Sequence, residues 1–200
     1  MIPAVRAEAL CYDIPGRPMN TNEGEFEDNL DVVRALLDQN EDSEDFLEAN
    51  ELVNRALALR PGDASAWILK AQVLSALDDD FAALAAIEMA LQRRPDLAEA
   101  HYWRAAVLTD LDRHEDALTA IERAFTHVGQ NRGQGVDDDW LLEELYYEKA
   151  LIEEALGHNE QAIATFREGL ERCPDSPALE SLERARRRAA FKVIPGGRAP

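Results

Sequence analysis

The chain has 200 residues, of which 40 are acidic and 21 are lysine or arginine, so its formal net charge is −19. This charge opposes binding to nucleic acid or to an anionic membrane surface, because both attract basic proteins. No stretch approaches the roughly 20 apolar residues of a membrane-spanning helix, and no secretory signal is visible. The chain has only two cysteines, Cys11 and Cys173, so we expect a reduced, cytoplasmic protein.

The N-terminal quarter of the chain predicts an arm followed by one pair of helices. Residues 1–25 contain three prolines and show weak periodicity, which favours a flexible arm. Leu30–Leu37 then predicts a short, divergent helix. Phe46–Leu59 predicts a second helix, because its apolar residues recur at helical spacing.

A repeat of 34 residues follows this pair. Pro61 and Pro95 are separated by that interval, and each follows an arginine. The same interval relates four further pairs: Ala71 and Ala105, Ala83 and Ala117, Ile87 and Ile121, Ala90 and Ala124. Each unit contains two apolar runs at helical spacing with a polar break between them. We therefore predict two antiparallel helices per unit, with carboxylates of Asp78–Asp80 capping the second helix of the first unit.

A third copy follows an insertion at residues 129–139. Its matching residues are Tyr146, Ala150, Gly157, Ala162, Phe166 and Pro174. The aromatic residue, the small residues at close spacing and the final proline in these copies resemble the tetratricopeptide repeat (TPR). The family's leucine is replaced by Lys70, Arg104 and Lys149, and its tyrosine by Glu153 in the third copy.

The resemblance implies an all-α fold, an α-solenoid of antiparallel helix hairpins. It would contain three clear units, a divergent N-terminal unit and a C-terminal capping helix from Ser176 to about Phe191. The domain would span residues 26–191 with the insertion as a loop, and residues 192–200 are predicted to be disordered.

No catalytic, metal or cofactor site is predicted, so we do not expect an enzyme. The four histidines form no ligand or nucleophile–base pattern, and Cys173 is interpreted as a packing residue. The aspartate triplets at 78–80 and 137–139 lack the alternating spacing of a calcium loop and are interpreted as helix caps.

The resemblance places the binding site on the concave face, which the first helix of each unit lines. One stripe per helix gives nine candidate groove residues: Ile68, Gln72, Glu99, Tyr102, Ala106, Glu144, Tyr147, Leu151 and Glu154. This stripe has an apolar and aromatic floor flanked by carboxylates, which favours a basic partner with apolar anchors. An alternative is that Tyr102 or Tyr147 packs between neighbouring first helices.

Family members that hold the acidic C-terminus of chaperones use a clamp of basic and amide side chains. Glu144 and Glu148 stand at two of the matching places here, so such a ligand is not expected.

The resemblance therefore implies a non-enzymatic adaptor that binds a protein or peptide. Alternatives are a dedicated chaperone of a secreted bacterial protein, or a regulator that uses the basic segment at residues 182–200 as a second contact. The sequence specifies neither the partner nor the oligomeric state.

Overall fold

The computed structural model describes residues 21–39, 43–128, 138–177 and 179, and in this part of the chain every regular element is a helix. The eight helices are α1 (Thr21–Gln39), α2 (Ser43–Leu59), α3 (Ala64–Ala76), α4 (Asp80–Arg93), α5 (Ala98–Asp110), α6 (His114–His127), α7 (Asp138–Ala155) and α8 (Asn159–Arg172). The predicted all-α fold is confirmed. None of these helices combines the length and apolar character that crossing a membrane requires.

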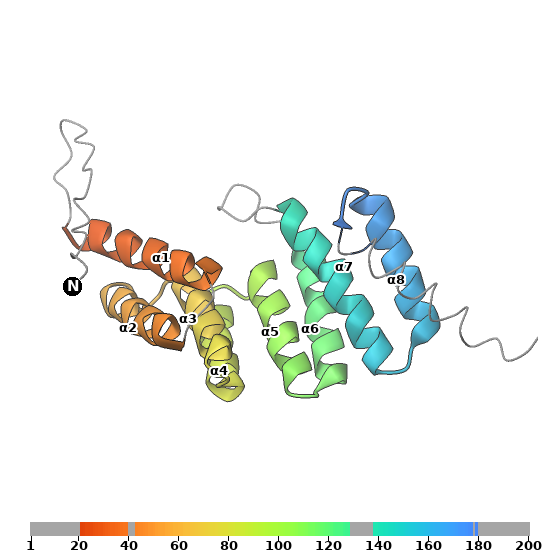
Figure 1. Ribbon diagram of the computed structural model, residues 1–200, viewed down its shortest axis with the longest axis horizontal. Coiled ribbons are helices and arrows are strands. Elements are labelled where there is room, and N and C mark those ends of the chain that lie inside the picture. Colours follow the sequence, from red (N-terminus) through yellow and green to blue (C-terminus); the bar gives the residue numbers. More distant parts are fainter. Residues whose placement is uncertain (1–20, 40–42, 129–137, 178, 180–200) are drawn as a thin grey trace, which may run out of the picture.

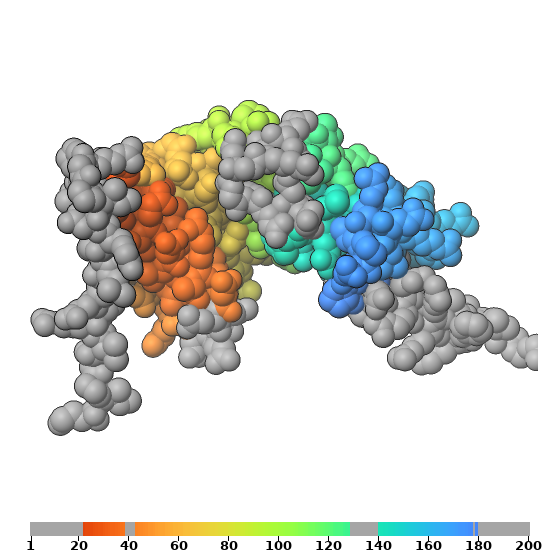
Figure 2. Space-filling model, turned by 90° about the horizontal axis from the view of Figure 1, so that it is seen from above, coloured from red at the N-terminus to blue at the C-terminus, as the bar shows by residue number. Residues whose placement is uncertain are grey.

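The helices form a row of antiparallel hairpins (Figure 1). Each odd-numbered helix packs on the next even-numbered one, and the odd-numbered helices also contact one another along the row, whereas the even-numbered helices do not. Elements on the inner side of a curved array lie closer together than those outside, so α1, α3, α5 and α7 line the concave face. Seen from above, the array bends into an arch (Figure 2). The predicted α-solenoid is therefore confirmed.

Small residues allow the two helices of each hairpin to approach closely, as the repeat predicts. The alanines at matching places in the three clear units are at most 1% exposed. They are Ala71, Ala83, Ala105, Ala117, Ala150 and Ala162. Short side chains at a helix crossing let the backbones pack tightly, and each hairpin then buries its apolar face against its neighbours.

The turns inside the three clear hairpins share one backbone conformation. Asp78, Asp112 and Gly157 occupy the same place and have φ values of 59°, 56° and 77°. Aspartate tolerates this left-handed region better than most residues, and glycine enters it freely. The predicted cap is confirmed for Asp79, whose carboxylate accepts a hydrogen bond from the Ala82 N–H at 3.1 Å.

The first helix is longer than the sequence indicated. It begins at Thr21, so residues 21–25, for which the sequence predicts a flexible arm, are helical. Phe26 is 1% exposed, and the Arg60 guanidinium lies 4.1 Å from the centre of its ring. Arg60 also pairs with Glu27 at 3.1 Å and with Glu23 at 3.6 Å. These contacts join the start of α1 to Arg60, directly after α2. They stabilise the first turns of α1, so this helix includes residues expected in the arm.

Several predictions on chain segments fall outside the described residues. These segments are residues 1–20 of the arm, residues 129–137 of the insertion, and residues 180–200, which include most of the capping helix. The start of that helix is described: Ser176 Oγ accepts a hydrogen bond from the Leu179 N–H at 3.2 Å, and Leu179 is fully buried. A serine hydroxyl bonded to the backbone three residues later is typical of a helix N-cap.

Candidate functional site

The candidate groove residues lie on three neighbouring helices of the concave face. Ile68 and Gln72 come from α3, Glu99, Tyr102 and Ala106 from α5, and Glu144, Tyr147, Leu151 and Glu154 from α7. All except Ile68 and Tyr102 are partly accessible. The structure therefore brings most of the predicted stripe to one surface.

Ile68 belongs to the core rather than to an accessible groove floor. Its side chain is 1% exposed and lies in a cluster with Ala64, Ala90, Leu97 and Ala100. The start of α5 packs against this part of α3 and α4, because the short turn after α4 leads directly into the next hairpin. A residue buried in this way supplies stability and not contact area for a partner.

Tyr102 packs between the first helices of two adjacent hairpins, as the alternative interpretation expected. It is 8% exposed and belongs to the core cluster of α5, α6 and α7. Its ring meets Trp103 and Trp140 edge-on, with centroid distances of 5.2 and 5.9 Å. Its hydroxyl donates a hydrogen bond to Glu144 Oε2 at 3.3 Å. Tyr102 therefore links α5 to α7 and supports the surface from beneath.

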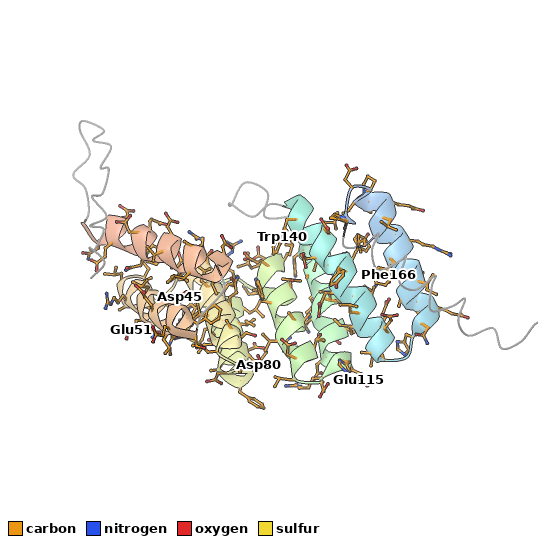
Figure 3. All side chains as sticks on the ribbon, in the orientation of Figure 1. Asp45, Glu51, Asp80, Glu115, Trp140 and Phe166 are labelled. Carbon is orange, nitrogen blue, oxygen red and sulfur yellow. The ribbon has the colours of Figure 1, made fainter. Side chains whose placement is uncertain are left out.

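Trp140 is a site residue that the sequence analysis missed. It is 41% exposed, and it lies in the first turn of α7, next to α5 (Figure 3). The helix begins at Asp138, so this tryptophan precedes Glu144 by one turn, and Glu144 precedes Glu148 by another. Residues at intervals of four share one helix face. We call Trp140, Glu144 and Glu148 the α7 column; its four-residue spacing was the available signal.

The carboxylates of the column are partly buried and have no basic partner in the part of the chain that the structure describes. Glu148 accepts a hydrogen bond at 3.0 Å from the Thr109 hydroxyl, which also faces the Ala105 carbonyl, and Glu144 accepts from Tyr102. No lysine or arginine of the described residues forms an ion pair with either carboxylate. Burial is the main cause that raises the pKa of both groups, because it penalises the charged form.

Glu99 on α5 adds a third partly buried carboxylate to this face. Burial raises its pKa, and the Trp103 side chain and the more distant Arg34 guanidinium only partly oppose that shift. Arg34 itself pairs with Asp31 at 2.7 Å. The part of the concave face formed by α5 and α7 is therefore acidic.

The cations on α3, α5 and α7 are directed at neighbouring hairpins instead. They are the three residues that replace the family's leucine. Lys70 bonds Asn50 and Asn54 of α2, the latter at 2.8 Å, and Arg104 pairs with Glu88 of α4 at 2.9 Å. Lys149 lies over the Phe125 ring of α6 at 5.8 Å. Each of these side chains thus reaches the second helix of the preceding hairpin, and none pairs with the column.

Replacing Glu148 with glutamine should stabilise the protein at neutral pH. Because folding raises the pKa of Glu148, ionisation of this group lowers the stability of the folded state as the pH rises from the ordinary glutamate value, and the loss is complete above the raised pKa. Glutamine keeps an oxygen for the Thr109 hydroxyl without the charge. We expect a melting temperature a few degrees higher at pH 7, and an advantage that disappears as the pH falls below about 4.3, the usual glutamate value. The exposed Glu122→Gln variant is the control; an equal gain there would contradict the explanation.

The histidine and cysteine side chains considered for catalysis or metal binding have packing contacts in the structure. His101 is 5% exposed, its Nε2 lies 2.9 Å from the Pro95 carbonyl oxygen, and its ring stacks on His127 at a centroid distance of 5.6 Å. Cys173 packs beside a core cluster that includes Phe166. The described residues contain no group of three or more histidine, cysteine, aspartate or glutamate side chains that could hold a metal ion.

Comparisons with known proteins give the repeat type and the fold. Sequence profiles of the tetratricopeptide repeat match residues 81–127 and 143–188. The MamA protein is a similar solved structure, with 19% identity, 77% of this chain and 76% of that chain covered, and a TM-score of 0.58. PilW, a type IV pilus biogenesis factor, is 17% identical, with 81% of this chain and 66% of that chain covered and a TM-score of 0.63. The TPR2B domain of yeast Sti1 in complex with pHsp70 is 18% identical, with 64% of this chain and 98% of that chain covered and a TM-score of 0.53. No curated protein sequence matches the chain.

Proposed function

The chain is a tetratricopeptide-repeat protein, and from this premise we propose that it is a non-enzymatic interaction module that binds a protein segment on its concave face. The observation that carries the proposal is the composition of that face between α5 and α7. Partly exposed Trp140, Tyr147 and Leu151 share α7 with Glu144 and Glu148, two carboxylates that form no ion pair with a cation of the described residues. Aromatic and apolar side chains supply contact energy, and unpaired carboxylates select the charge of the partner.

The chemistry of the face supports a basic partner with apolar anchors. The TPR2B domain of yeast Sti1, similar in fold, was solved in complex with pHsp70, which supports a protein as the kind of partner. An acidic ligand would meet Glu144 and Glu148 here, and like charges brought together on a partly desolvated surface repel strongly. A basic segment would instead supply a positively charged partner for Glu144 and Glu148.

A double substitution on α7 tests the proposal. Tyr147→Ala with Leu151→Ala removes two partly exposed anchors from the concave face. Peptides selected from a random 12-residue library on the immobilised full chain should bind this variant more weakly by roughly 2 kcal/mol, about thirtyfold, because anchors at the centre of an interface carry most of its energy. Isothermal titration calorimetry measures the change.

The matched control removes exposed apolar side chains from the second helices. Phe81 on α4 is 77% exposed and Ile163 on α8 is 42% exposed. Phe81→Ala with Ile163→Ala should leave peptide affinity unchanged. If the control pair abolishes binding and the α7 pair does not, the ligand occupies another surface and the proposal is wrong.

A further inference from the structure

Resting on the proposed function, we propose that the α7 column is a subsite for one arginine side chain of the partner. The guanidinium would lie against the Trp140 ring and bridge the Glu144 and Glu148 carboxylates, while flanking apolar residues of the partner cover Tyr147 and Leu151. The occupant is therefore a peptide segment that contains an arginine beside apolar residues.

Trp140 provides an aromatic surface that is held in place. Its ring contacts Tyr102 edge-on at 5.9 Å, and Tyr102 is itself fixed by burial and by its hydrogen bond to Glu144. The contact leaves 41% of the tryptophan exposed. An accessible tryptophan is the best aromatic partner for a cation, because the face of its ring carries partial negative charge.

The two carboxylates retain most of their capacity to accept hydrogen bonds. Among the described residues, each accepts a hydrogen bond from one neutral hydroxyl, that of Tyr102 or Thr109, whereas an ionised carboxylate offers about four acceptor positions. Other carboxylates at helix contacts have cations from the chain: Glu88 pairs with Arg104 at 2.9 Å, and Glu153 with Lys149 at 3.8 Å. Glu144 and Glu148 differ from Glu88 and Glu153 in having no such cation among the described residues.

The spacing of the column favours arginine over lysine. Glu144 and Glu148 are one turn apart on α7, and side chains at that interval lie about 5–6 Å apart at their Cβ atoms. A planar guanidinium has five N–H donors in a fixed fork, so it can bond both carboxylates while it stacks on an aromatic ring. A lysine ammonium is a compact point charge and cannot make all three contacts in the same way.

Burial of the carboxylates adds a pH signature. The pKa of each group is raised in the free protein, mainly by burial, and a bound guanidinium would lower it again. Binding of an arginine peptide should therefore release protons at mildly acidic pH. Its affinity should rise with pH until both carboxylates are ionised in the free protein and then level off.

Peptide selection on the full chain tests the subsite. A random 12-residue library is selected on the natural protein and on the Glu144→Gln, Glu148→Gln double variant, and we expect arginine to be enriched only with the natural protein. The best peptide is then synthesised with lysine, and with citrulline, the neutral isostere of arginine, at the enriched position. Lysine should weaken binding about tenfold and citrulline about a hundredfold. The double variant should bind the three peptides equally.

The outcomes separate this inference from the proposed function. Peptides that lose affinity for the Tyr147→Ala, Leu151→Ala variant but show no arginine preference would overturn the subsite and leave the binding face standing. An arginine preference that persists in the double glutamine variant would also overturn the subsite. Peptides unaffected by every α7 variant would overturn both. If the double variant is unstable, Glu148→Gln alone against arginine and citrulline peptides measures the same coupling, and additive losses contradict it.

Discussion

Replacing Tyr102 with alanine should lower the free energy of unfolding by about 3–5 kcal/mol, the usual cost of removing a buried aromatic ring. The ring fills the space between α5 and α7 and contacts two tryptophans, so its removal leaves a cavity that the rigid hairpins cannot close. Glu144 would also lose its hydrogen-bond donor. Chemical denaturation measures the loss.

Two matched variants separate the contributions to this effect. Tyr102→Phe keeps the ring and removes only the hydroxyl, so we expect a loss of about 1 kcal/mol. Tyr147→Ala removes a tyrosine at the matching position of the next unit that is only partly buried, and it should cost less than Tyr102→Ala. Equal losses for Tyr102→Ala and Tyr147→Ala would show that Tyr102 does not hold the two hairpins together.

The different roles of these two tyrosines show what the repeat pattern could not predict. They occupy equivalent places in consecutive units, so the sequence suggested one shared role. The insertion removes that equivalence, because α7 starts at Asp138 and gains a turn that α5 lacks. The extra turn carries Trp140 over Tyr102 and buries Leu141 to 2% exposure. A 34-residue period has no place for such a turn.

The hairpins themselves were predictable, because their determinants are local. The interval from Pro61 to Pro95, the small residues at helix crossings and the acidic break before α4 each act within one unit. The long α1 was not predictable in the same way. Its buried residues are Phe26, Leu30 and Val33, which stand among many acidic residues, and contacts with the distant Arg60 hold its first turns.

The contact between α7 and α8 depends on a glycine whose role the repeat pattern did not indicate. A Cβ atom added to Gly169 would lie 2.8 Å from Tyr146 Cβ and 3.1 Å from Leu179 Cδ1. The Cβ of Tyr146 is fixed to the backbone of α7 and cannot rotate away, so an added methyl group forces the two helices apart. The site therefore requires a residue without a side chain, although glycine disfavours a helix.

Gly169→Ala should consequently destabilise the protein by about 1–3 kcal/mol, the cost of overfilling a packed contact, even though alanine is the better helix former. Gly24→Ala in α1 is the matched control, because no atom lies within 4 Å of its added Cβ, and it should stabilise by about 0.5–1 kcal/mol. Opposite signs for the two substitutions in denaturant unfolding would establish the close approach; a gain at both positions would refute it. Because α7 also carries the α7 column, a displacement of this helix should also weaken peptide binding in Gly169→Ala and leave it unchanged in Gly24→Ala.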